Sequence, residues 1–218
     1  MFYEPEKNNH NLPHDPFKAC VIPRPIAWIS TMSLGGIPNL APYSQFQNLT
    51  FDPPYVMFAA NQTTDGRRKD TVVNVEQSGE FVYNMATYDL REAVNLSAQQ
   101  VPSEVDEFEL AGVTKAPSRL VKSPRVAESP VHFECLYYQT FRLPGNSPMS
   151  TVDIVIGKVI GIHIQDQFIT SDGKLDILKI RPIARLGYYD YTIVESVFQM
   201  VIPGPNEKLR VGMEGRRG

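Results

Sequence analysis

Proline is the residue that most restricts how this chain can fold, because 18 prolines are spread along its 218 residues. A proline ends a helix and interrupts the hydrogen-bond ladder of a sheet, so long uninterrupted elements are not expected. Between the prolines lie runs rich in β-branched and aromatic residues, which predict short strands. The predicted strands cover residues 26–32, 55–60, 81–86, 131–141, 152–164 and 183–188.

Signals for helices are fewer. Asp70 is placed to cap a helix over residues 70–77, with Gly79 just beyond its end. Helical spacing of apolar residues predicts a second helix over 88–99, and a short helical turn is expected over 105–110. Because strands dominate and do not alternate regularly with helices, we predict a mainly β fold, an antiparallel barrel with a few peripheral helices. No Gly-x-Gly-x-x-Gly follows a strand, which disfavours a Rossmann domain.

Charge and hydropathy argue against two kinds of partner. The chain has 21 Lys and Arg against 24 Asp and Glu, so it lacks the strongly basic character of nucleic-acid-binding proteins. The most apolar stretch, residues 154–164, contains Lys158 and His163 and is shorter than the ~20 apolar residues of a spanning helix. Residues 1–14 contain no apolar core of a signal peptide, so a cytoplasmic location is predicted.

The cysteines and histidines predict no metal site. Cys20 and Cys135 are far apart and form no C-x-x-C motif, so we expect two reduced thiols and neither a disulfide framework nor a zinc site. Metal-ligand spacing is also missing among the four histidines, His10, His14, His132 and His163.

Residues 20–54 combine prolines, a glycine turn and polar side chains where apolar alternation should continue. Proline breaks leave backbone N–H groups free, and such groups can bind acceptor atoms along the edge of a planar ligand. In that interpretation Trp28 and Phe46 form an apolar wall, while Ser44 and Asn48 supply polar contacts. The alternative is a barrel strand with turn residues and ordinary core aromatics, and the residues alone favour this alternative.

Arg67, Arg68 and Lys69 directly precede the expected start of a helix, at Asp70 and Thr71. Cationic side chains beside the N-terminus of a helix are well suited to bind a phosphate monoester. The alternative is a solvated run of charge capped by Asp70, and the run by itself favours this alternative. The negative net charge of the whole chain gives some weight to the phosphate interpretation.

Taken in order, four motifs identify a resemblance to a known family. They are PRPIAWIST, GGIPNLAPYSQF, FDPP and RKDTVVN, which begin at Pro23, Gly35, Phe51 and Arg68. Their order and spacing resemble those of the flavin reductase-like, FMN-binding split-barrel family, in its flavoredoxin-type branch. The resemblance covers residues 15–192 of a single domain, 1–218, and leaves residues 193–218 as a C-terminal tail.

The resemblance implies a six-stranded antiparallel split barrel that forms a homodimer and binds FMN near the dimer interface. It also implies a set of FMN-binding residues. The phosphate would be held by Arg67, Arg68, Lys69, Asp70 and Thr71, with help from Arg24 or Thr31. The isoalloxazine would be lined by Ala41, Tyr43, Ser44, Phe46 and Asn48, with Phe108 on the mobile side of the pocket.

The activity implied is a flavin oxidoreductase in which NAD(P)H is the co-substrate and hydride passes from nicotinamide C4 to flavin N5. That step needs orientation of two rings and no general acid or base, which fits a sequence with no obvious catalytic triad. His163 is the candidate side chain facing the nicotinamide, and the alternative for His163 is a structural role. Arg185 is a further candidate, as a positive charge near the site. The alternative is that Arg185 forms an ion pair on the surface.

Two other functions stay open at this point. The chain could be a flavoredoxin-like FMN electron carrier that serves a redox partner protein without efficient use of NAD(P)H. It could also be a β-barrel binding protein that has lost the flavin, although the basic cluster at 67–71 argues against that.

Finally, the apolar segment 197–202 is expected to pack on the partner subunit, because an isolated apolar tail is costly to expose.

Overall fold

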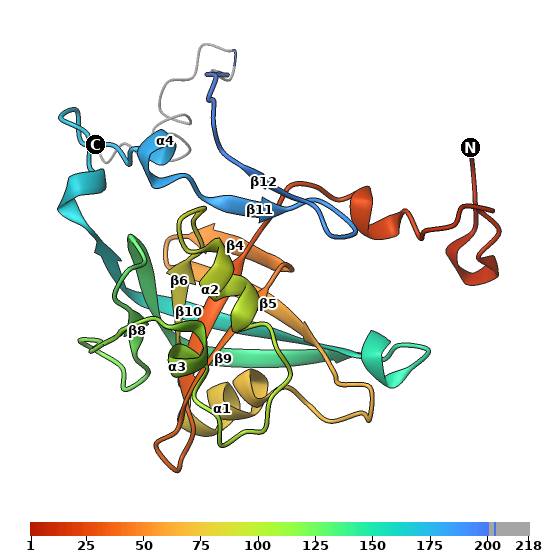
Figure 1. The fold of residues 1–218 in the computed structure, drawn as a ribbon, viewed down its shortest axis with the longest axis horizontal. Helices are drawn as coiled ribbons and strands as arrows, with labels where there is room; N and C mark the ends of the chain where they lie inside the picture. The colour runs from red at the N-terminus through yellow and green to blue at the C-terminus, as the bar shows by residue number, and fades with distance from the viewer. Residues whose placement is uncertain (201–202, 204–218) are drawn as a thin grey trace.

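The computed structural model describes residues 1–200 and residue 203, and its largest feature is a seven-stranded antiparallel sheet (Figure 1). The strand order is β3-β2-β6-β9-β10-β5-β4. Its strands are β2 (Ala27–Met32), β3 (Pro38–Tyr43), β4 (Phe46–Phe51), β5 (Pro54–Asn61), β6 (Glu80–Met85), β9 (Val131–Leu143) and β10 (Val152–Ile164). Two smaller antiparallel sheets accompany it. One contains β1 (Arg24–Pro25), β11 (Ile183–Arg185) and β12 (Tyr191–Ile193), and the other contains β7 (Lys115–Ala116) and β8 (Arg125–Val126).

Short helices surround the large sheet. They are α1 (Asp70–Ser78), α2 (Arg91–Leu96), α3 (Glu107–Ala111) and α4 (Ile177–Ile180), with single 3-10 turns at Pro5–Lys7, Phe17–Ala19, Pro148–Ser150 and Asp166–Phe168. The first three helices gather beside the β2–β3 edge of the sheet, where α1 contacts β2 and β3, α3 contacts β3, and α2 contacts both α3 and β3 (Figure 1). This arrangement places the N-termini of α1 and α3 close to the edge strand β3.

The core consists of two adjoining apolar clusters. One cluster joins Phe58 and Phe81 on the sheet to Val72 and Val75 on α1, all of them fully buried. The other surrounds Trp28, whose indole Nε1 donates to Ser97 Oγ at 2.8 Å. Since helices and strands contribute side chains to both clusters, the start of α1 is held rigidly against the sheet.

The predicted mainly β, antiparallel class is confirmed, and the strand count differs. The large sheet has seven strands where the resemblance implies six, and β3 and β4 lie outside the predicted set. Pro38 and Pro42 obscured β3 in the sequence. An edge strand tolerates prolines because one row of its N–H groups needs no partner, and β3 is such an edge.

Most predicted elements are present, with shifted ends. The strand at 152–164 has the predicted bounds, while the one expected over 183–188 stops at Arg185, before a tight turn in which Tyr188 has φ of 51°. The helix expected over 88–99 covers only Arg91–Leu96, and the turn expected over 105–110 is α3.

The start of α1 corrects one detail of the sequence analysis. Lys69, and not Asp70, occupies the N-cap position, and its backbone is extended, with φ of −65° and ψ of 140°. Asp70 is the first residue of the helix itself. Gly79 ends α1 in the left-handed conformation, as its position in the sequence predicted.

Within residues 1–200 and 203, no helix is long and apolar enough to cross a membrane. Of the apolar segment 197–202 that is expected to contact a partner subunit, residues 201 and 202 lie outside the described part of the chain. Val197, Phe198 and Met200 of that segment are exposed to solvent.

Candidate functional site

A cavity of about 480 Å³ lies where β3, the start of α1 and the segment after α2 meet. This volume lies within the usual range for sites that bind small molecules and cofactors. Its walls come from four stretches of the chain that are distant in sequence. The lining residues are Asn39, Ala41, Pro42, Tyr43, Thr63, Arg67, Arg68, Lys69, Asp70, Thr71, Ser97, Ala98, Gln99, Gln100, Val101, Pro102 and Glu107.

The start of α1 presents unpaired donors at this cavity. The first N–H groups of a helix have no partner within the helix. In the described part of the chain, the backbone N–H groups of Lys69, Asp70 and Thr71 also have no acceptor elsewhere. They lie at the positive end of the helix dipole, so the wall attracts an anion.

Two cations extend this wall, and they differ in their surroundings. Lys69 is half-buried, and burial lowers the pKa of its amine because water is withdrawn from the charged form. Arg67 is largely exposed and donates from Nε to Asp65 Oδ2 at 2.7 Å. An anion bound here would remain within reach of water, and it would add to the negative charge that Asp70 already places near Lys69.

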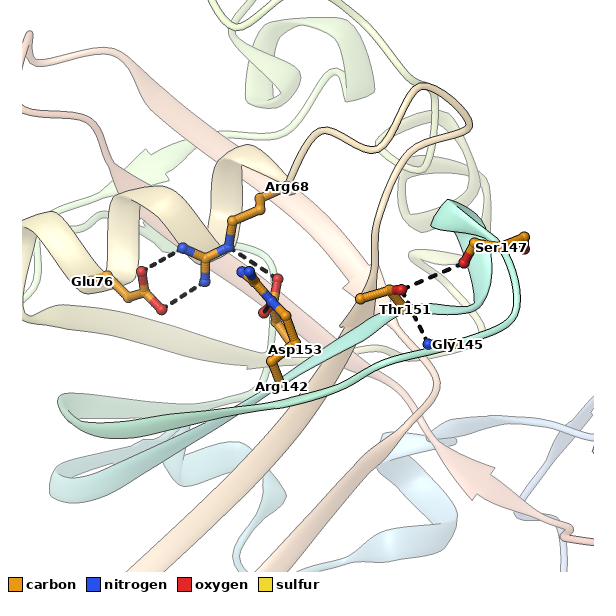
Figure 2. A network of polar contacts seen from close by, with 7 residues as sticks. All are labelled: Arg68, Glu76, Arg142, Gly145, Ser147, Thr151 and Asp153. Atoms are coloured by element: carbon orange, nitrogen blue, oxygen red, sulfur yellow. Dashed lines mark hydrogen bonds and ion pairs between the residues drawn. The ribbon is translucent and has the colours of Figure 1, made fainter.

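Arg68, although it lines the cavity, directs its guanidinium into a network of carboxylates (Figure 2). Nη1 and Nη2 donate to the two oxygens of Glu76 at 2.7 Å each, and Nε donates to Asp153 Oδ2 at 3.0 Å. Asp153 is almost fully buried, and it also accepts from Arg142 Nε at 2.8 Å. Arg68 therefore ties the start of α1 to β10, and its charge is balanced within the fold.

A network of buried polar side chains lies behind Thr71. Thr71 Oγ1 donates to Asn39 Oδ1 at 2.7 Å, and Asn39 Nδ2 donates to Glu107 Oε1 at 2.9 Å. Thr31 joins the network at 3.3 Å from Asn39 Oδ1, and it accepts from Asn74 Nδ2 at 3.1 Å. Thr31 thus supports the wall from behind and does not itself line the cavity.

Sequence analysis gave no role to Asn39, Asn74 or Glu107. Glu107 begins α3, and its Oε2 accepts from the backbone N–H of Leu40 at 3.1 Å. Burial raises the pKa of Glu107 above the ordinary value of a glutamate. A single sequence carries no signal that joins Asn39 to a carboxylate so far along the chain.

Other predicted cofactor-binding residues lie elsewhere, outside the lining formed by the described residues. Arg24 donates from Nη1 to the carbonyl oxygen of Val21 at 2.6 Å. Ser44 follows β3, and Phe46 and Asn48 belong to β4, which lies at the opposite end of the strand order from β3. Phe46 instead stacks on Tyr83, with ring centroids 4.7 Å apart.

Phe108, His163 and Arg185 also have other surroundings. Phe108 is fully buried in the core cluster around Trp28, which is not the position expected of a residue on the mobile side of a pocket. His163 Nε2 lies 2.5 Å from Oε1 of the buried Glu134, and this contact holds β10 to β9 within the fold. Arg185 donates to Tyr191 Oη at 2.5 Å within the β11–β12 sheet.

Fold and cavity together define a mainly β protein with a cofactor-sized cavity beside the N-terminus of α1. The sequence profile of the Flavin reductase like domain matches residues 19–190, and the chain belongs to that family. An uncharacterised protein of Aquifex aeolicus is 38% identical over 171 residues, which cover 78% of this chain and 84% of the relative.

Two solved structures support the assignment of the fold. Nitrilotriacetate monooxygenase component B from Bacillus cereus superposes with a TM-score of 0.83 at 27% identity, covering 92% of this chain and 98% of the other. Flavoredoxin of Desulfovibrio vulgaris (Miyazaki F) superposes with a TM-score of 0.71 at 18% identity, covering 83% and 91%. The fold is the split barrel of this family, as the resemblance implied.

Proposed function

We propose that the protein binds FMN in this cavity and acts as an NAD(P)H-dependent flavin oxidoreductase. One observation carries the proposal: the unpaired N–H groups of Lys69, Asp70 and Thr71 face a cofactor-sized cavity beside two cations. A phosphate monoester carries ~1.5–2 negative charges at pH 7, which suits that wall. Membership of the flavin reductase like domain family supports a flavin as the molecule that carries the phosphate.

The residues that line the cavity would have different roles toward FMN. Lys69, Arg67 and the helix N-terminus would bind the phosphate, while Ala41 and Tyr43 on β3 would form the wall beside the ring system. Asp70 lines the same cavity and adds negative charge, so it does not serve as a phosphate ligand through its side chain. Arg68 would act by fixing the start of α1 against β10.

When bound, FMN would supply an acceptor for hydride at its N5 atom. The protein's part is to orient the flavin and to limit the access of water, since this transfer requires neither a general acid nor a general base. Tyr43 on β3 would form part of the wall that does this, and burial raises the pKa of Tyr43 further above its ordinary value, so its hydroxyl stays neutral at pH 7. His163 is held by Glu134, and we assign it no catalytic role.

Absorption spectroscopy tests the FMN site first. The purified protein is mixed with FMN or with riboflavin, which lacks the phosphate, and each sample is passed through a desalting column. We expect a flavin spectrum to be retained with FMN and largely lost with riboflavin. Equal retention of both would contradict a phosphate site at the start of α1. Retention of neither would favour a barrel that has lost the cofactor, or a reductase that treats FMN as a passing substrate.

A second candidate is an FMN electron carrier that serves a redox partner protein, and the likeness in fold to flavoredoxin supports it. Anaerobic stopped-flow reduction of the FMN-loaded protein by NADH and by NADPH separates the two proposals. Rapid bleaching of the flavin by either nucleotide supports the oxidoreductase. Very slow bleaching by both, with FMN tightly bound, supports the carrier.

We further propose a cytoplasmic homodimer. Support comes from large apolar side chains that remain exposed on the single chain, such as Phe51 at 72% and Tyr138 at 61% exposure. These side chains are neighbours, since Phe51 pairs with Pro54 on β5 and Tyr138 contacts the adjacent Tyr55. Contiguous exposed apolar surface commonly marks an interface. Size-exclusion chromatography with light scattering should give twice the mass of the chain. Deletion from residue 197 onward should weaken this dimer, and an unchanged dimer would refute a role for the tail in assembly.

A further inference from the structure

Glu107 is an unexpected group at the wall of a phosphate site, because it places a carboxylate among donors. Its side chain lines the cavity, and the residue is only 6% exposed. Both carboxylate oxygens are already engaged by β3, Oε1 by Asn39 Nδ2 and Oε2 by the backbone N–H of Leu40. The carboxylate is therefore fixed in one orientation.

The fixed carboxylate determines the direction of every hydrogen bond between it and Thr71. An ionised carboxylate only accepts, so Asn39 must present its Nδ2 to Glu107 and its Oδ1 to the other side. An amide oxygen also only accepts, so Thr71 must donate its single hydroxyl hydrogen to Asn39, at 2.7 Å. The Thr71 hydroxyl is then left with lone pairs and no hydrogen to offer a ligand.

We propose that Glu107 is a positioning residue which, through Asn39, turns the Thr71 hydroxyl hydrogen away from the cavity and so weakens the hold on a phosphate monoester. The inference rests on the proposed function and adds a property to it. A site with this arrangement releases FMN more readily than one in which Thr71 donates to the phosphate. Glu107 thus favours exchange of the flavin over permanent retention.

Protonation of Glu107 should reverse the arrangement. A neutral carboxylic acid has a hydrogen to donate. If the Asn39 amide rotates by half a turn, its Oδ1 accepts from Glu107 and its Nδ2 donates to Thr71. Thr71 is left free to donate to a ligand. Burial raises the pKa of Glu107, and Asp70, which faces the same cavity from α1, raises it further by repulsion.

Other charged groups surround Glu107 but do not replace it in this role. Arg67, Arg68 and Lys69 line the cavity from the start of α1. On its own helix, Asp106 and Glu109 both approach Lys115, and Asp106 also accepts from the backbone N–H of Phe108. Of all these groups, none contacts Asn39, so the link to Thr71 belongs to Glu107.

Glu107→Gln tests the proposal, because glutamine keeps an acceptor for Leu40 and offers a donor to Asn39. Fluorescence titration should give an FMN dissociation constant about ten- to a hundredfold lower than that of the wild type at pH 8, the gain of one hydrogen bond to a charged group. Riboflavin affinity should be unchanged. The control Glu109→Gln removes the same charge from the exposed side of α3 and should alter neither constant.

The pH profile and a double mutant distinguish positioning from simple repulsion. The ratio of the wild-type to the Glu107→Gln constant should fall toward one as the pH is lowered and Glu107 takes up a proton. The titration of the phosphate cancels in this ratio. The gain should vanish in the Thr71→Val background. A gain that persists without the Thr71 hydroxyl would show direct repulsion of the phosphate and would overturn the proposal, as would no gain at all.

A readout without flavin separates this inference from the proposed function. In the ¹⁵N-labelled wild type, the side-chain amide resonances of Asn39 should shift with pH as Glu107 titrates, and in Glu107→Gln they should not. Resonances that stay constant in the wild type would overturn the proposal whether or not FMN binds. If these resonances shift as expected but the wild type fails to bind FMN, the hydrogen-bond relay stands and the proposed function fails.

Discussion

Arg68 and Lys69 are adjacent cations with opposite expected roles, and replacing each by methionine tests the structural assignment. For Arg68→Met we expect a loss of stability with little effect on FMN affinity. Arg68 forms two bonds of 2.7 Å to Glu76 and one of 3.0 Å to Asp153. Asp153 keeps Arg142 as a partner in the variant, so no buried carboxylate is left without a cation.

The size of the loss follows from burial. Arg68 and Glu76 are each a little over a quarter exposed, so solvent screens their pair to about 0.5–1 kcal/mol. The bond to Asp153 involves a carboxylate that is 1% exposed, and such a charge-assisted bond contributes about 1.5–3 kcal/mol. We therefore expect the free energy of unfolding of Arg68→Met to be about 2–4 kcal/mol lower than that of the wild type.

Urea denaturation measures this loss. With a slope in the usual range of about 1–3 kcal/mol per molar, the midpoint should fall by about 1 M or more. The matched control is Lys69→Met, which removes a cation without an ion-pair partner in the described part of the chain. Its midpoint should stay near that of the wild type, while its FMN dissociation constant should rise about ten- to a hundredfold.

The reverse pattern would refute this assignment. If Arg68→Met kept its midpoint and lost FMN affinity as strongly as Lys69→Met, the guanidinium would have to leave Glu76 and Asp153 to bind the phosphate. Riboflavin serves as the ligand control, because its affinity should be equal in both variants and the wild type.

Three further changes test the fold around the site. Burial lowers the pKa of His132 to about 4, against about 6.5 in an unfolded chain, so the unfolded state binds more protons between these values. Stability should therefore fall as the pH drops from about 6.5 to 4 by up to about 3 kcal/mol, and His132→Gln should flatten that part of the urea-midpoint profile. Gly157→Ala places a Cβ 2.4 Å from the Phe81 ring, so calorimetry should show a loss of about 1–3 kcal/mol, and an unchanged melting temperature would contradict the packing. Trp28→Phe removes the 2.8 Å bond to Ser97 and should lower the melting temperature by about 3–6 °C, whereas a shift under 1 °C would mean that this bond adds nothing.

The sequence by itself determined the features that depend on short stretches of chain. The alternation and β-branched content of residues 152–164 fixed β10 to its observed ends. The basic cluster 67–69 and the start of α1 are contiguous, so the sequence alone places cations beside a helix N-terminus. The ordered motifs between Pro23 and Asn74 likewise identified the family, which the match over residues 19–190 bears out.

Only the tertiary structure decided which of these side chains meet. Arg68 and Lys69 are neighbours in sequence, yet Arg68 is drawn toward Asp153, 85 residues further along the chain. Asn39 and Glu107 lie 68 residues apart and meet because α3 packs against β3. The physical reason is that strand pairing and helix docking bring distant residues into contact. Local sequence cannot specify the carboxylate or amide that will satisfy a given donor once the chain has folded.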